Sequence, residues 1–143
     1  MSKIKTFRGL LSDGVEEKIR LSTLTGTSGY RILKFELIPP APGDSNGENV
    51  VKIYKVTQAA VDALVDFTET TMLAAGYYAA ESSSYSDNKT VVFDNEIFNQ
   101  DIFITNKDAR GNSQSINYYI ELEQVKLDSN ETAVATLKNI RNR

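Results

Sequence analysis

The sequence predicts an all-β protein, an antiparallel β-sandwich of jelly-roll-like type with about eight short strands and at most one or two short helical turns. Apolar and polar residues alternate with a period of two along most of the chain, which is typical of strands with one buried face. Clusters of Gly, Asn and Asp separate the alternating runs and favour turns. Because 143 residues suit one domain with its own core, we expect residues 1–143 to form a single sandwich.

Most of the expected strands follow directly from this alternation. They cover residues 15–24, 30–38, 50–56, 90–94, 101–105, 116–127 and 132–140. The run 116–127 is the clearest, because four large side chains share one face: Ile116, Tyr118, Ile120 and Leu122. Glu121 and Glu123 alternate with them and are expected to face water. Turn signals separate the runs at residues 13–14, 25–29, 46–47, 86–88, 108–112 and 128–130.

The run 30–38 changes its facing partway along. Tyr30 and Ile32 fall on one face, whereas Leu33, Phe35 and Leu37 fall on the opposite face. Such a switch predicts a β-bulge or a strand that passes from one sheet to the other.

Two segments are expected to lie outside the sheets. Pro39, Pro40 and Pro42 cannot donate to a strand ladder, so residues 39–48 are predicted to form one long exposed loop. This loop either connects strands across the end of the sandwich or contacts a partner. Residues 1–8 are expected to form an N-terminal arm.

Residues 57–80 fit two descriptions. Thr57 can cap a short helix, and residues 68–75 can form a second helical turn that Gly76 ends. Alternatively, residues 72–80 form a buried strand. We favour a strand through Tyr77 and Tyr78, with a loop or one helical turn before it.

Composition excludes several classes of function. The chain has no Cys and no His, which removes disulfides, thiolate chemistry and the commonest general base and metal ligand. The net charge of −3 is too small to indicate binding to nucleic acid or to a membrane surface. No apolar run approaches the length of a membrane span, and the N-terminus has no signal-peptide pattern, so we expect the protein to be made and folded in a cytoplasm. The sequence predicts a protein that is not an enzyme and binds no cofactor.

One acidic stretch invites comparison with a cation site. It contains Asp94, Glu96 and Asp101 together with Asn95 and Asn99. The spacing matches no EF-hand loop, and apolar residues interleave with the acids. We therefore favour a polar corner between two short strands over a Ca²⁺ site, and predict no metal.

The chain as a whole resembles small virion structural proteins of tailed bacteriophages, particularly those of marine bacteria. The likeness lies in the order of the segments SDGVEEKIRL, GYRILKFELIP, VFDNEIFNQDIFI and INYYIELE. This resemblance implies attachment to a phage particle, as capsid decoration or as part of a tail or fibre. It carries no functional residues with it, because the family offers no motif to map.

These considerations lead to a first functional hypothesis, a capsid decoration or cement protein that contacts the major capsid protein or another virion protein and forms a dimer or trimer. Strands alternate, so one ring of each tyrosine pair is expected to face outward, where it either serves an interface or makes ordinary packing contacts. The candidate interface residues are Lys3, Lys5, Phe7, Pro39, Pro40, Pro42, Tyr78, Tyr119 and Arg141. The alternatives are a carbohydrate-binding or host-recognition module and a carboxylate-based hydrolase.

Overall fold

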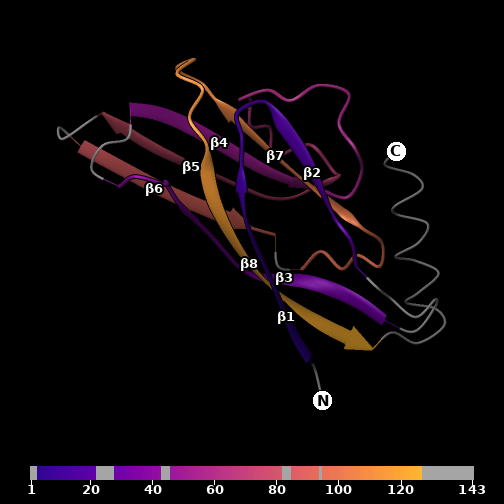
Figure 1. Ribbon diagram of the computed structural model, residues 1–143. Coiled ribbons are helices and arrows are strands. Elements are labelled where there is room, and N and C mark those ends of the chain that lie inside the picture. The colour runs from indigo at the N-terminus through magenta and orange to yellow at the C-terminus, as the bar shows by residue number, and fades with distance from the viewer. Residues whose placement is uncertain (1–2, 22–27, 43–45, 82–84, 94, 127–143) are drawn as a thin grey trace.

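The computed structural model describes residues 3–21, 28–42, 46–81, 85–93 and 95–126, which form a sandwich of two antiparallel sheets (Figure 1). The strands are β1 (Lys3–Leu11), β2 (Val15–Ile19), β3 (Ser28–Ile38), β4 (Asn46–Tyr54), β5 (Met72–Glu81), β6 (Tyr85–Val92), β7 (Ile102–Asp108) and β8 (Ile116–Lys126). The predicted all-β antiparallel sandwich is confirmed. The described residues include no helix that is long and apolar enough to cross a membrane.

The strand order explains how a single chain builds both layers. One sheet has the order β1-β8-β3, and the other has the order β2-β7-β4-β5-β6. The first strand thus pairs with the eighth, the second with the seventh and the fourth with the fifth, as in the double Greek key of a jelly roll. The third and sixth strands lie beside each other, where the Asn88 side-chain amide donates to the Leu37 carbonyl at 3.1 Å.

The core lies between the sheets and follows the alternation read from the sequence. The predicted inward face of β8 is confirmed, since Ile116, Tyr118, Ile120 and Leu122 are all buried. Ile19 and Leu21 are buried as well, although β2 ends at Ile19. The expected strand over residues 132–140 lies outside the described residues.

The predicted β-bulge is present in β3. The register between β3 and β8 shifts between Ile32 and Lys34, so Leu33 is the extra residue. The bulge restores the inward facing instead of reversing it: Phe35 and Leu37 are buried on the same side as Ile32, and Leu33 is exposed. The assignment of Leu33 to the face of Phe35 is therefore wrong.

The N-terminal segment is a strand and not an arm. Residues 3–11 pair with β8 along their whole length, from Lys3 opposite Gln124 to Leu11 opposite Ile116. Alternation explains this, because Lys5, Phe7, Gly9 and Leu11 are less exposed than Thr6, Arg8 and Leu10. The first two residues lie outside the described chain.

The proline loop is shorter than predicted. Asn46, Gly47 and Glu48 belong to β4 and pair with β5, so the turn expected at residues 46–47 is wrong. Gly47 serves close packing, since a Cβ there would lie 2.6 Å from Cγ of Gln114. The turn expected at residues 86–88 is also wrong, because these residues are part of β6. In contrast, the turns at residues 13–14 and 108–112 are confirmed, with positive φ at Gly14 and Gly111.

A buried carboxylate organises the turn after β7. Asp108 accepts hydrogen bonds from the main-chain N–H groups of four residues at 3.0–3.1 Å: Glu48, Arg110, Asn112 and Gln114. Burial alone would raise the pKa of Asp108, but these four donors together lower it below its ordinary value. The side chain thereby joins the start of β4 to the turn that leads into β8.

Candidate functional site

The connection between β4 and β5, residues 55–71, lies over the outward face of the five-stranded sheet and contains no helix. We call it the covering loop; in Figure 1 it is the wide loop beside the β2 and β7 labels. The helical turns considered for residues 57–64 and 68–75 are absent, and residues 72–81 form β5. A hydrogen bond from the Lys55 N–H to the Thr71 carbonyl, 2.8 Å long, closes the base of the loop.

A buried lysine holds the covering loop onto the sheet. Lys52 points outward from β4, since its neighbours Val51 and Ile53 lie in the core, yet its side chain is only 4% exposed. Its ammonium donates to Oδ1 of Asp62 at 2.7 Å and to the Leu64 carbonyl at 2.5 Å. The hydrogen bond from Lys52 lowers the pKa of Asp62 below its ordinary value. A buried ammonium needs such partners, so the ion pair fixes the middle of the loop.

A second, smaller core lies beneath the end of the loop. Tyr54, Met72 and Ala75 are buried together, and Phe93 packs against them. Phe67 of the loop meets Phe93 edge to face, with ring centroids 5.3 Å apart and an interplanar angle of 87°. This geometry is a favourable one for aromatic pairs. It attaches the far side of the loop to the sheet.

Two short side-chain motifs stiffen the last part of the loop. The Asp66 carboxylate accepts from the N–H and the hydroxyl of Thr68 at 2.9 and 2.6 Å. These bonds lower the pKa of Asp66, with the hydroxyl making the larger contribution. The Glu69 carboxylate accepts in the same way from Thr71 at 3.2 and 2.9 Å. Such motifs give the backbone an alternative to helix, which explains the absent helical turn.

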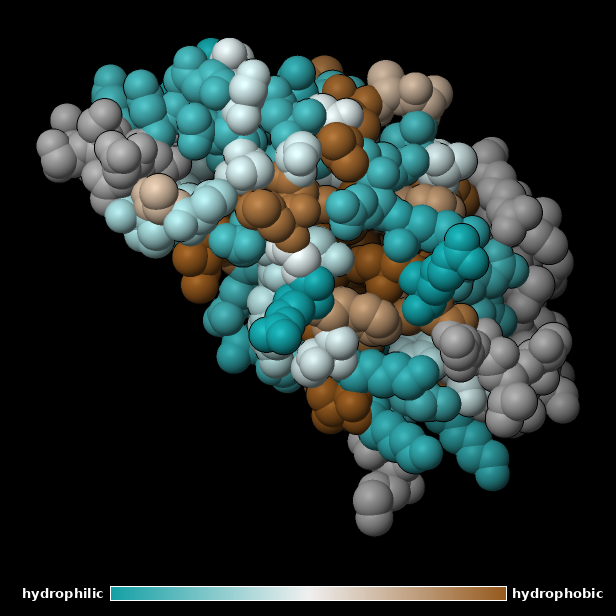
Figure 2. Space-filling view, in the orientation of Figure 1, coloured by the Kyte–Doolittle hydropathy of each residue, from teal (hydrophilic) through white to brown (hydrophobic). Residues whose placement is uncertain are grey.

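The anchored loop presents three apolar side chains to solvent. Leu64, Val65 and Phe67, which we call the apolar ridge, are 76%, 48% and 55% exposed. The three ridge residues themselves line one side of a groove of about 390 Å³ on the outward face of the sheet. Its lining includes Val50, Ala63, Ala75, Tyr77, Lys89 and Val91. Figure 2 shows brown patches of this kind interrupting a mainly hydrophilic surface. Grouped exposed apolar side chains are typical of interaction sites.

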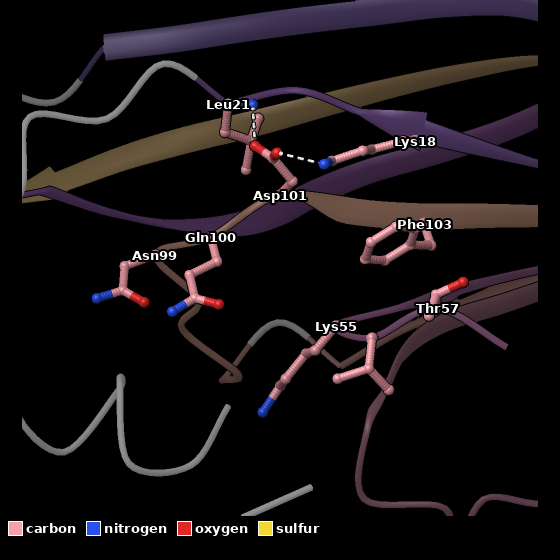
Figure 3. A pocket seen from close by; sticks show the side chains of 9 residues that line it. Lys18, Leu21, Lys55, Thr57, Asn99, Gln100, Asp101 and Phe103 are labelled. Atoms are coloured by element: carbon pink, nitrogen blue, oxygen red, sulfur yellow. Dashed lines mark hydrogen bonds and ion pairs between the residues drawn. The ribbon is translucent and has the colours of Figure 1, made fainter. Parts of the chain in front are cut away.

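A second hollow of about 620 Å³ lies at the ends of β2, β4 and β7 (Figure 3). Asp101 accepts from the Leu21 N–H at 2.7 Å and forms an ion pair with Lys18 at 3.4 Å. Lys55, which also lines the hollow, pairs with Glu96 at 3.0 Å. The charges that line this hollow are therefore balanced by neighbours.

The acids considered for a cation site do not converge. Glu96 is engaged with Lys55, and Asp101 is engaged with Lys18 and Leu21. Asp94 lies outside the described residues. Within the described ranges, no group of three or more acidic side chains is arranged to hold a metal ion. The two acids serve as separate structural ion pairs.

The predicted interface residues are scattered over the molecule. Lys3 is exposed at the start of β1, but Lys5 and Phe7 turn inward: Lys5 donates to the Tyr30 hydroxyl at 3.1 Å, and Phe7 packs against the core. Pro39 is buried, whereas Pro40 and Pro42 are exposed. Arg141 lies outside the described residues.

Each tyrosine pair has one inward and one outward ring, as predicted. Tyr118 is buried, and Tyr119 lies on the outer face, where its hydroxyl donates to Glu121 at 2.8 Å. In the other pair the expectation for Tyr78 is wrong, because Tyr78 packs against the core and Tyr77 faces outward. The Tyr77 hydroxyl donates to Asp87 at 2.7 Å.

The sequence reasoning missed the apolar ridge. The run VDALVDF at residues 61–67 shows neither strand alternation nor a long helical period, so its pattern predicts only a short helix or a loop. A usable signal was the spacing of Asp62 and Asp66 with Thr68, which favours local turns between apolar residues.

No protein-family model and no curated protein matches this chain. The geometry of the described residues therefore provides the basis for a functional proposal.

Proposed function

We propose that this protein is a non-enzymatic structural component of a bacteriophage particle, which attaches to the capsid surface as a decoration or cement protein. The observation that carries this proposal is the apolar ridge, three exposed apolar side chains on a loop whose base is closed by a main-chain hydrogen bond and whose middle and end are fixed to the sheet. A preorganised apolar surface binds a protein partner without the entropy cost of first ordering the loop.

The proposed partner is a protein surface with a complementary apolar hollow, on the major capsid protein or a neighbouring virion protein. Burial of Leu64, Val65 and Phe67 would supply the central apolar contact that stable protein interfaces require. The groove beside the ridge offers space for a side chain of the partner in return.

Three further observations support an assembly role over catalysis. The chain contains no His or Cys. Asp101 is the one acid among the residues that line the larger hollow, and it is paired with Lys18, so no pair of carboxylates faces that space. The jelly-roll strand order also occurs in capsid proteins, although a fold alone assigns no function.

Quantitative mass spectrometry of purified virions tests this proposal. We expect the protein in particles of the phage that encodes it, in a fixed ratio to the major capsid protein. A tail or fibre component would appear in a few copies per particle instead. Particles that lack the protein altogether would overturn the proposal.

A further inference from the structure

The two sheets together present four strand edges, at β1 and β3 in one sheet and at β2 and β6 in the other. The outer edge of β3 is bridged to the segment before β7: the Tyr30 N–H donates to the Phe98 carbonyl at 2.7 Å, and the Phe98 N–H donates back at 2.9 Å. Strand β6 lies beside β3, and its Asn88 side chain reaches the Leu37 carbonyl. These contacts account for two edges.

The edge at β2 is held by the covering loop. The Glu16 carboxylate accepts from the Gln58 N–H at 2.8 Å and from the Thr57 hydroxyl at 2.7 Å. Strand β1 likewise has one strand partner, β8, among the described strands, and the hydrogen bonds recorded from other described segments to its backbone involve only the Leu11 carbonyl, which accepts from the Asn106 amide at 3.1 Å. It is nine residues long, contains no proline and shows no register shift. Such an edge is a template for pairing with another strand.

We propose that two copies of this protein pair through β1, antiparallel and centred on Phe7, to join their three-stranded sheets across a two-fold axis. In this register Ile4 lies opposite Leu10 of the second copy, Thr6 opposite Arg8, and Lys5 opposite Gly9. All nine residues of the strand take part. Antiparallel pairing of this length forms about eight to ten main-chain hydrogen bonds.

The side chains of β1 favour this register over its neighbours. The inward faces of both copies stay together only when the register moves in steps of two residues. Centring the pair on Lys5 places the two Lys5 side chains opposite each other, and centring it on Arg8 does the same for Arg8; like charges in opposite positions are destabilising. Centring it on Thr6 keeps only residues 3–9 of the described strand opposite one another, so Leu10 and Leu11 gain no partner within β1. Only the register centred on Phe7 avoids like-charge pairs over the full strand.

Apolar burial supports the same arrangement. Ile4 and Leu10 face outward on β1 and are 51% and 53% exposed, although they are large apolar side chains. The proposed register brings them together twice, once at each end of the paired strands. Cross-strand contacts of this kind stabilise a sheet.

Lys5 needs separate consideration, because an inward-pointing lysine on an edge strand is one device that prevents edge pairing. Here its ammonium turns toward its own sandwich, where it donates to the Tyr30 hydroxyl and lies 5.4 Å from the centre of the Tyr30 ring. The residue opposite it in the second copy is Gly9, which has no side chain to meet it. Lys5 is therefore compatible with the pairing.

This inference goes beyond the proposed attachment to a particle, since a dimer would form in the purified protein alone. Sedimentation velocity over a range of concentrations tests it. We expect wild type to dimerise, the variant Ile4→Lys/Leu10→Lys to weaken dimerisation at least about tenfold by placing lysines opposite each other, and Ile4→Lys/Leu10→Glu to restore it. The control Leu33→Lys/Ile38→Lys changes two exposed apolar residues of β3 on the same outer face and should leave the dimer intact.

A cross-link reads out the register directly. The chain contains no cysteine, so Thr6→Cys/Arg8→Cys introduces the only thiols. In the proposed register the thiol at position 6 of each copy lies opposite the thiol at position 8 of the other. We expect a disulfide-linked dimer on oxidation, and none from Ile4→Cys, whose partner position is Leu10. A wild-type protein that stays monomeric at every concentration, or a dimer that both charge variants weaken equally, would overturn the inference. Either result leaves the particle proposal to its own test.

Discussion

The outward-facing side chains of the two sheets differ in burial, although the strands of both sheets alternate inward and outward residues in the same way. On the five-stranded sheet, outward residues such as Lys52 and Tyr54 are buried beneath the covering loop. On the three-stranded sheet, the outward residues stay at the surface and satisfy one another, as in the Arg31–Glu123 ion pair at 2.7 Å. The difference shows that a third layer, and not the strand itself, decides whether an outward position is structural. It also explains why the apolar ridge sits where it does, on the segment that forms this layer.

The largest expected effect compares two outward tyrosines. Tyr54→Ala removes a buried ring from the smaller core and should lower the free energy of unfolding by about 3–5 kcal/mol. Tyr119→Ala removes a ring from the uncovered face and should lower it far less. Urea unfolding of both variants measures the difference. Equal effects would show that the covering loop does not bury the sheet beneath it.

The next comparison concerns two ion pairs. Asp62→Ala leaves the Lys52 ammonium buried without its carboxylate and should cost about 2–3 kcal/mol, less than for a fully buried pair because Asp62 itself is 55% exposed. Glu123→Ala breaks the surface pair with Arg31 and should cost less than about 1 kcal/mol. Thermal unfolding of the two variants side by side is the measurement. A smaller loss from Asp62→Ala than from Glu123→Ala would contradict the anchoring role of Lys52.

Acid should act on a third region, the turn that joins the two sheets. The pKa of Asp108 is lower in the folded protein than in the unfolded chain, so its stabilising contribution is complete at neutral pH and is lost as the pH falls through the folded value. Asp108→Asn should therefore lower the free energy of unfolding by about 1–2 kcal/mol at pH 7, with a smaller difference from wild type in strong acid. Unfolding curves of both proteins from pH 7 to pH 2 test this. A difference that stays constant over that range would exclude a charged Asp108 as the organiser of the turn.

The smallest effect on stability is expected at the ridge. Leu64→Ser/Val65→Ser replaces two exposed side chains and should change the free energy of unfolding by no more than about 0.5 kcal/mol. Differential scanning calorimetry is the check. A large loss would mean that the ridge belongs to the core of the loop and is not a surface held ready for a partner.

How far the sequence could be read differs between these same regions. Alternation alone predicted the inward face of β8 and the bulge in β3, because each depends on the side-chain pattern of one strand. It misplaced Leu33, since a bulge can either reverse or restore facing, and only the partner strand decides which. The prediction of an arm at residues 1–8 failed for a different reason. Nothing near these residues in the sequence shows that β8, more than a hundred residues later, is available to pair with β1.

The candidate site was less accessible to sequence reasoning. The burial of Lys52 depends on Asp62, ten residues away across a loop with no regular period. The exposure of Leu64 depends on the same contact, so neither residue carries a signal of its own. The predicted interface residues include loop prolines and tyrosines, which stand out by residue type. Whether such a side chain is exposed depends on the direction in which its strand or loop faces as much as on its chemistry.

The most direct test of this account is co-sedimentation of the purified protein with capsids that lack it. We expect wild type and the control Leu33→Ser/Ile38→Ser, which changes exposed residues on the other sheet, to pellet with the capsids to the same extent. The ridge variant Leu64→Ser/Val65→Ser should stay in the supernatant while remaining folded. Binding of the ridge variant at wild-type level would contradict the claim that the covering loop is the docking surface.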